Sequence, residues 1–175
     1  TFAPTPGVAV GHNERVAWGV TNAGPDTQDF YIEKINPANS KQYEFQGKYE
    51  DFQIARETIK VKGGADQTID VKISRHGPIM TPVLKGITET LALQWTSLRE
   101  RGAIVRSALR LDHAQNWDEF RQALKDWDSP SQNFVYADVD GNIGYQMPGK
   151  IPIRKSGDGW TYVPGWNDEH EWIGY

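Results

Sequence analysis

Two aspartates three positions apart, Asp26 and Asp29, are the first residues in this sequence whose type and spacing could do chemistry. They follow a loop of small residues, and Gln28 lies between them. Calcium is bound by carboxylate oxygens and backbone carbonyls, and the short segment Asp-Thr-Gln-Asp offers both. An aspartate after Gly-Pro is also ordinary turn chemistry. The spacing therefore leaves two interpretations open, a calcium site and a solvated turn.

Groups that could form a nucleophilic site are present but poorly placed. Thr1 carries a hydroxyl beside a free α-amine, as in N-terminal-nucleophile hydrolases, but the run Pro4-Thr5-Pro6 that follows is typical of a loop and not of a buried strand. No Gly-x-Ser-x-Gly elbow occurs, and no two histidines have the i, i+4 spacing that holds zinc on a helix. We therefore predict no nucleophile at Thr1 and structural roles for the four histidines, His12, His76, His113 and His170.

Composition excludes several classes of partner. The net charge of −4 is spread over 175 residues without a basic block, which argues against nucleic acid. No apolar run approaches the roughly 20 residues that span a bilayer, so no membrane partner is expected. The absence of cysteine removes disulfides and thiol nucleophiles, and it fits an exported protein as readily as a cytosolic one. The length favours a single domain over residues 1–175.

Alternating apolar residues predict short antiparallel strands joined by tight turns. The pattern covers residues 8–20 around a turn at 11–13, residues 59–73 around Gly63-Gly64, residues 91–95, and residues 133–145 around Asp140-Gly141. The last of these contains Asp138 in a stretch that resembles a calcium loop, but the glycine and glutamate positions of an EF-hand are absent. We predict that Asp138 stabilises the hairpin.

Two stretches have helical spacing, about Leu98–Leu111 and a second that opens at Asn116. Asn116 and Glu119 have the spacing of a capping box. The aromatic and apolar residues of the second stretch, Trp117, Phe120, Leu124 and Trp127, fall on one side. Such a stripe is typical of a helix that docks on a core, so we predict packing and no cofactor site. The fold class expected from strands and helices together is α+β.

Six segments occur together and in order in one known family. They are "PGVAVGHNERVAWGVTNAGPDTQDFY", "HGPIM", "ALQW", "NWDEFRQAL", "QNFVYADVDGNIGYQMPGKIPIR" and "VPGWNDEHEWIGY". Nearly the whole chain resembles the large subunit of penicillin acylases, the penicillin amidase family of N-terminal-nucleophile hydrolases. The resemblance implies a four-layer αββα fold and a precursor that cleaves itself into a small and a large subunit.

The nucleophile that the resemblance implies is a serine at the start of the large subunit, activated by its own α-amine. An α-amine with a pKa near 7.7 to 8.0 can be neutral at working pH and accept the hydroxyl proton, so no placed histidine is needed. Family members have several dozen residues between that serine and their Gly-His-Asn turn, whereas ten residues precede Gly11 here. We therefore expect an internal fragment of the large subunit, truncated at both ends, without the nucleophile.

The resemblance also implies the roles of individual residues. Asn22 matches the position whose backbone N–H helps form the oxyanion hole, Asn133 matches the asparagine whose side-chain amide completes it, and Arg154 matches an arginine near the nucleophile. Asp26, Gln28 and Asp29 match calcium-binding positions, with a further acid ligand from the small subunit. Calcium takes 6 to 8 oxygens, so this fragment alone would hold it weakly.

The implied reaction is hydrolysis of a carboxamide, either penicillin or another N-acyl amide, through an acyl-enzyme. The expected partners are a small-molecule acyl amide and the small subunit of the same precursor, and the resemblance implies a periplasmic or secreted location. The alternative from another class is a non-catalytic β-rich module that binds calcium at Asp26 and Asp29 and a glycan on Trp160, Trp166 and Trp172. Packing is the other interpretation of these three tryptophans. A glycoside hydrolase would need a carboxylate pair at a spacing that the sequence does not demonstrate.

Overall fold

The computed structural model describes residues 7–98 and 102–175, and the chain divides into two compact units. The first unit combines Thr1–Thr27 with Arg99–Ile151, and the second combines Gln28–Leu98 with Pro152–Tyr175. The single domain over residues 1–175 stays a prediction, and Thr1 lies outside the described residues. None of the helices in the described residues is long and apolar enough to cross a membrane.

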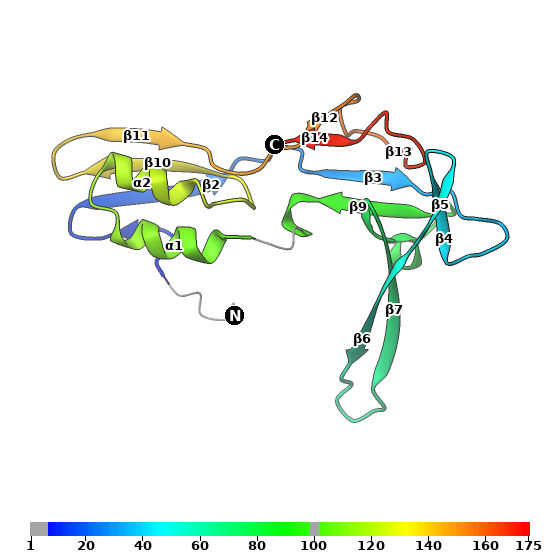
Figure 1. The fold of residues 1–175 in the computed structure, drawn as a ribbon. Helices are drawn as coiled ribbons and strands as arrows, with labels where there is room; N and C mark the ends of the chain where they lie inside the picture. Colours follow the sequence, from blue (N-terminus) through cyan, green and yellow to red (C-terminus); the bar gives the residue numbers. More distant parts are fainter. Residues whose placement is uncertain (1–6, 99–101) are drawn as a thin grey trace. The chain divides into compact units, whose positions relative to one another are not determined.

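The first unit is a four-stranded antiparallel sheet with two helices packed on one face (Figure 1). The strand order is β1-β2-β10-β11, with bounds Gly11–His12, Val16–Asn22, Gln132–Asp138 and Ile143–Gln146. Helices α1 (Ile104–His113) and α2 (Trp117–Leu124) follow each other along the chain and contact each other. Alternate strand residues, among them Trp18 and Phe134, meet Leu111 and Phe120 of the helices in one buried core. The intervening strand residues, among them Asn133, lie on the other face of the sheet.

Helix α2 confirms the predicted cap and packing face. The backbone N–H of Glu119 donates to Asn116 Oδ1 at 2.9 Å. In a capping box the Glu119 carboxylate would accept from the backbone N–H of the N-cap residue, Asn116. Here it accepts from the backbone N–H of the preceding residue, Gln115. The four residues of the predicted stripe all lie in or against the core.

Helix α1 begins at Ile104, later than the predicted start near Leu98. Thr96–Leu98 form a 3-10 turn, and part of the predicted first turn, residues 99–101, lies outside the described residues. Gly102 precedes the helix, and a glycine inside it would cost about 1 kcal/mol relative to alanine. A start after Gly102 is therefore favoured.

The two hairpins of the first unit differ in how well sequence predicted them. The β10–β11 hairpin is confirmed, with Ala137 opposite Ile143. As predicted, the carboxylate of Asp138 stabilises it, because this group accepts from the side chain and backbone of Asn142 and from the backbone of Asp140, and these bonds lower the pKa of Asp138 to about 2. The first turn was predicted too early: Gly11 is in a strand and the turn follows Asn13, whose side-chain oxygen accepts from the backbone N–H groups of Arg15 and Val16.

The second unit is built mainly from small antiparallel sheets. Strand β3 (Gln28–Ile32) lies between β9 (Leu91–Trp95), antiparallel, and β13 (Val163–Pro164), parallel. The remaining strands are β4 (Gln42–Phe45), β5 (Lys48–Asp51), β6 (Gln53–Ile59), β7 (Gln67–Ser74), β8 (Gly77–Pro78), β12 (Ile153–Arg154) and β14 (Trp172–Gly174), with a 3-10 turn at Thr81–Val83. The predicted strand at 91–95 and the hairpin around Gly63-Gly64, now β6–β7, are confirmed.

The C-terminal segment of the second unit carries two short strands, β13 and β14, joined by irregular backbone. Trp172 is partly buried and its indole N–H donates to Asp29 Oδ2, so it is a packing residue. Trp160, in contrast, is 86% exposed in the described chain, so no packing role is seen for its ring there. Its backbone N–H donates to Asp158 Oδ1.

Candidate active site

The end of β2 and the start of β10 bring together the two predicted oxyanion residues, Asn22 and Asn133. In the antiparallel register Asn133 lies opposite Thr21, and Gln132 lies opposite Asn22. Asn133 Nδ2 donates to Thr21 Oγ1 at 3.1 Å and to the backbone carbonyl of Asn22 at 3.2 Å. Gln132 Nε2 donates to Asn22 Oδ1 at 2.9 Å. A compact cluster of amide groups therefore occupies this end of the sheet.

The backbone N–H of Asn22 points to the edge of β2 that faces away from β10. In an antiparallel pair, residues alternate between those that bond across the pair and those that do not. The bonds from Val139 N to Arg15 O (3.0 Å) and from Ala23 N to Ser131 O (3.4 Å) assign the odd-numbered residues of β2 to the bonded set. Asn22 therefore directs its N–H to the opposite edge of β2. Within the described chain, β1 covers that edge only at Ala17 and Trp18.

Tyr145 is a neighbour of this cluster that sequence reasoning missed. It lies on β11 opposite Val135, and its hydroxyl donates to Asn133 Oδ1 at 2.6 Å. Asn133 and Tyr145 are thus diagonal neighbours on one sheet face, a separation that a long aromatic side chain can bridge. The predicted hairpin contained the signal, because its register places Tyr145 on the same face as Asn133.

Arg154 lies in the second unit, where it binds Asp29. Its Nε donates to Asp29 Oδ2 at 2.8 Å and its terminal nitrogen donates to Oδ1 at 3.1 Å. The pair is buried, with 12% of the Arg154 side chain and 5% of the Asp29 side chain exposed. Arg154 and Trp172 are partners across β12–β14, which explains why both reach the same carboxylate. The role of Arg154 near a nucleophile stays a prediction.

Replacing Arg154 with lysine is expected to lower the free energy of unfolding by about 1–2 kcal/mol. Lysine keeps the charge but loses the planar fork that makes two parallel bonds to Asp29. The urea midpoint of the full-length protein measures this effect. The matched control is Arg56→Lys, because Arg56 makes the same fork with Asp70 at an exposed position, where such pairs contribute little. Equal midpoint shifts for the two variants would contradict the prediction.

Asp29, one of the three residues expected to bind calcium, is paired with an arginine and a tryptophan in the described chain. Both carboxylate oxygens of Asp29 accept from Arg154, and one also accepts from Trp172. Within residues 7–98 and 102–175 no group of three or more His, Cys, Asp or Glu side chains could hold a metal ion. Calcium binding at Asp26, Gln28 and Asp29 stays a prediction, and no step of the proposed mechanism uses it.

A second buried ionisable cluster surrounds His76. Its Nδ1 is 2.8 Å from Glu33 Oε1 and its Nε2 is 2.7 Å from Glu171 Oε1. The ring also stacks on Tyr31, with centroids 3.9 Å apart. Burial alone would lower the pKa of His76, but its hydrogen bonds to the carboxylates of Glu171 and Glu33 outweigh burial and raise the pKa above its usual 6.5. His76 is thus buried and paired on both ring nitrogens, which favours the predicted structural role.

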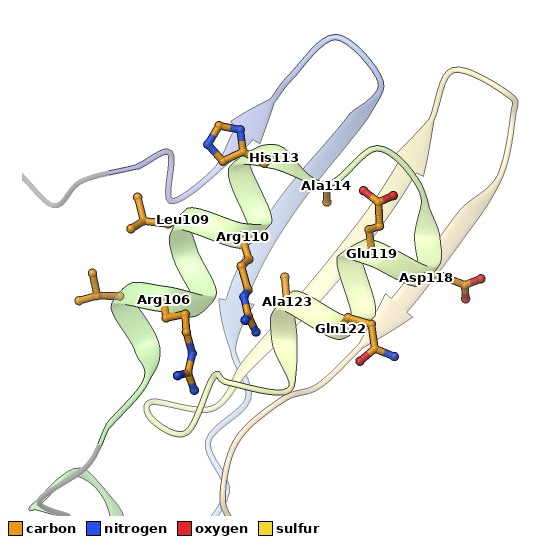
Figure 2. Close-up of a pocket in the computed structure, with 10 residues that line it drawn as sticks. Arg106, Leu109, Arg110, His113, Ala114, Asp118, Glu119, Gln122 and Ala123 are labelled. Atoms are coloured by element: carbon orange, nitrogen blue, oxygen red, sulfur yellow. The ribbon is translucent and has the colours of Figure 1, made fainter.

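A groove lies between α1 and α2 (Figure 2), and none of the predicted catalytic or calcium-binding residues lines it. Both apolar residues, among them Leu109 and Ala123, and charged residues line it. Arg106 and Arg110 at its side both pair with Asp126. The helices thus cover one face of the sheet, while Asn133 and Tyr145 lie on the other.

Comparison with solved structures first defines the class of fold. The chain superposes on a thermostable penicillin G acylase from Alcaligenes faecalis with a TM-score of 0.82 and 29% identity, covering 97% of this chain and 30% of that one. The α+β fold therefore matches part of a penicillin G acylase, as predicted. The family model described as Penicillin amidase matches residues 1–175. The chain belongs to the penicillin amidase family.

Curated relatives agree with this assignment. The penicillin acylase 2 proenzyme of Pseudomonas sp. (strain SE83) is 33% identical over 165 residues, which are 94% of this chain and 21% of that protein. The penicillin G acylase of Escherichia coli is 34% identical, over 97% of this chain and 20% of that protein. The acyl-homoserine lactone acylase QuiP of Pseudomonas fluorescens (strain Pf0-1) is 34% identical, over 100% of this chain and 22% of that protein. The chain spans about a fifth of the length of these relatives.

Proposed function

We propose that this chain is part of an amidohydrolase that cleaves a linear carboxamide through an acyl-enzyme. The nucleophile in this proposal is an N-terminal serine that lies outside the chain. One observation carries the proposal: an outward-directed backbone N–H at Asn22 and a side-chain amide at Asn133 lie at the same end of two paired strands. Two fixed N–H donors are what acyl transfer requires, because the carbonyl oxygen gains negative charge as it is attacked.

The chain's own residues stabilise this charge in the proposed mechanism. The serine oxygen attacks the carbonyl carbon while the α-amine of the serine accepts its proton. The resulting oxyanion accepts from the N–H of Asn22 and from Asn133 Nδ2. Asn133 then exchanges one of its present acceptors, Thr21 Oγ1 or the carbonyl of Asn22, for the oxyanion. The C–N bond breaks, the amine leaves with the proton, and water hydrolyses the ester.

The substrate class is proposed from the relatives, whose names include penicillin acylases and acyl-homoserine lactone acylases. Both names describe the removal of an acyl group from an amide nitrogen. We therefore propose an N-acyl amide as substrate, and a second polypeptide of the same precursor as the partner that completes the enzyme.

The full-length protein is expected to release a free amine and a carboxylic acid from an N-acyl amide in equal amounts. A panel of a penicillin, an N-acyl-homoserine lactone and an N-acyl p-nitroanilide, with chromatography of both products, measures this. N-terminal sequencing of the mature subunits shows whether a serine begins one of them. The same protein with that serine changed to alanine is the control. If none of the panel members released an amine, the proposal would be overturned.

A further inference from the structure

The side-chain amide of Asn133 is held in one orientation by groups at both of its ends. The backbone carbonyl of Asn22 can only accept a hydrogen bond, so the end that faces it at 3.2 Å must be the Nδ2 group. The Tyr145 hydroxyl then donates to the other end, Oδ1, at 2.6 Å. An asparagine amide turned by 180° would place two oxygens against each other at Asn22. Both contacts therefore favour the same orientation.

Tyr145 is rigidly linked to Asn133 through the sheet. Strands β10 and β11 pair from Phe134 to Ala137, and Tyr145 lies opposite Val135 in that pairing. Its aromatic side chain has two rotatable bonds, so it loses little conformational entropy when it holds a partner. Thr21, the other neighbour of the amide, is fixed by the β2–β10 pairing. Asn133 thus lies between two paired strands that both hold its amide.

We propose that Tyr145 is a positioning residue for the oxyanion hole: its hydroxyl holds Asn133 Oδ1 so that Nδ2 faces the Asn22 end of β2. This inference rests on the proposed function. Tyr145 touches neither the nucleophile nor the substrate in this role, and it acts through Asn133. An amide that is free to rotate spends part of its time with Oδ1 toward the oxyanion, where it repels negative charge.

Tyr145→Phe in the full-length protein is expected to lower kcat for an N-acyl p-nitroanilide about 3- to 10-fold with little change in KM. This is the size of effect expected for the loss of one neutral hydrogen bond that matters in the transition state. The control is Tyr49→Phe, because Tyr49 is similarly exposed, at 49% against 57% for Tyr145, and lies on β5 in the second unit. The thermal midpoint of each variant separates positioning from loss of folding.

The double variant Tyr145→Phe/Asn133→Ala distinguishes positioning from direct action. If Tyr145 acts through Asn133, the double variant is no slower than Asn133→Ala alone. If Tyr145→Phe lowers kcat equally in both backgrounds, Tyr145 acts independently and the inference is wrong. Wild-type kcat in Tyr145→Phe with a slow Asn133→Ala variant would overturn the inference but leave the proposed function intact. Wild-type kcat in Asn133→Ala would overturn the oxyanion role itself.

Discussion

Asn133→Ala in the full-length protein is expected to lower kcat for amide hydrolysis by about 10²–10³, the usual cost of removing one oxyanion donor. KM should change little, because the developing charge exists only in the transition state. The effect follows from the position of Asn133, whose Nδ2 lies within hydrogen-bond distance of the backbone of Asn22. Steady-state kinetics with an N-acyl p-nitroanilide measure both constants.

Asn133→Asp sharpens this experiment because aspartate has nearly the same shape as asparagine. It replaces the Nδ2 donor with an acceptor oxygen and adds a negative charge beside the oxyanion, so it should be at least as slow as Asn133→Ala. The matched control is Asn39→Ala, which removes an exposed amide whose oxygen accepts from the backbone N–H of Lys41. Near-normal turnover in both Asn133 variants, with unchanged thermal midpoints, would remove this residue from the mechanism.

Local patterns in the sequence predicted the elements that depend on neighbours in the chain. The β10–β11 hairpin follows from alternating apolar residues around Asp140-Gly141, and the N-cap of α2 follows from Asn116 and Glu119. These features are set by turn chemistry and by capping within a few residues. The pairing of β2 with β10 joins segments more than a hundred residues apart, and here the family resemblance, not periodicity, predicted that Asn22 and Asn133 belong together.

Strand β3 shows why burial in the second unit could not be predicted from periodicity. Its apolar residues Phe30 and Ile32 alternate in the sequence, which favours their burial. The structure instead buries Asp29, Tyr31 and Glu33, because each has a polar partner in a distant segment. Asp29 binds Arg154, the Tyr31 hydroxyl donates to the carbonyl of His170, and Glu33 binds His76. A polar group can be buried at low cost only when it is paired, and those pairings are set by tertiary structure.

His76→Leu is expected to lower the free energy of unfolding by about 3–5 kcal/mol, the typical cost of removing one partner from a buried ion pair. The variant leaves the carboxylate of Glu33, whose side chain is 0% exposed, without its partner. Glu33 Oε2 already lacks a hydrogen-bond partner within the described part of the chain. Urea unfolding of the full-length protein measures the loss. Adding Glu33→Gln to this variant removes the buried charge and should recover much of the stability, whereas the same substitution alone should not stabilise the protein.

The pH dependence of this contribution provides an independent check. Because the pKa of His76 is raised in the folded protein, its stabilising effect is fully present below about 6.5 and is lost as pH rises through the folded pKa. Burial alone would raise the pKa of Glu171, but His76 and Arg75 outweigh burial and lower it below 4.5. The stabilising effect of Glu171 is therefore present above about pH 4.5 and is lost as the pH falls through the pKa of Glu171 in the folded protein.

The two shifts define a window from about pH 4.5 to 6.5 in which the cluster contributes most. Three other charged or titratable groups lie near the imidazole. Arg75 contacts both Glu171 and Glu50, and the Tyr31 ring stacks on the imidazole. The stability difference between wild type and His76→Leu should therefore be largest within that window and decrease on both sides. A difference that stays constant from pH 4 to pH 9 would show that packing of the imidazole, and not its charge between Glu33 and Glu171, holds this part of the second unit together.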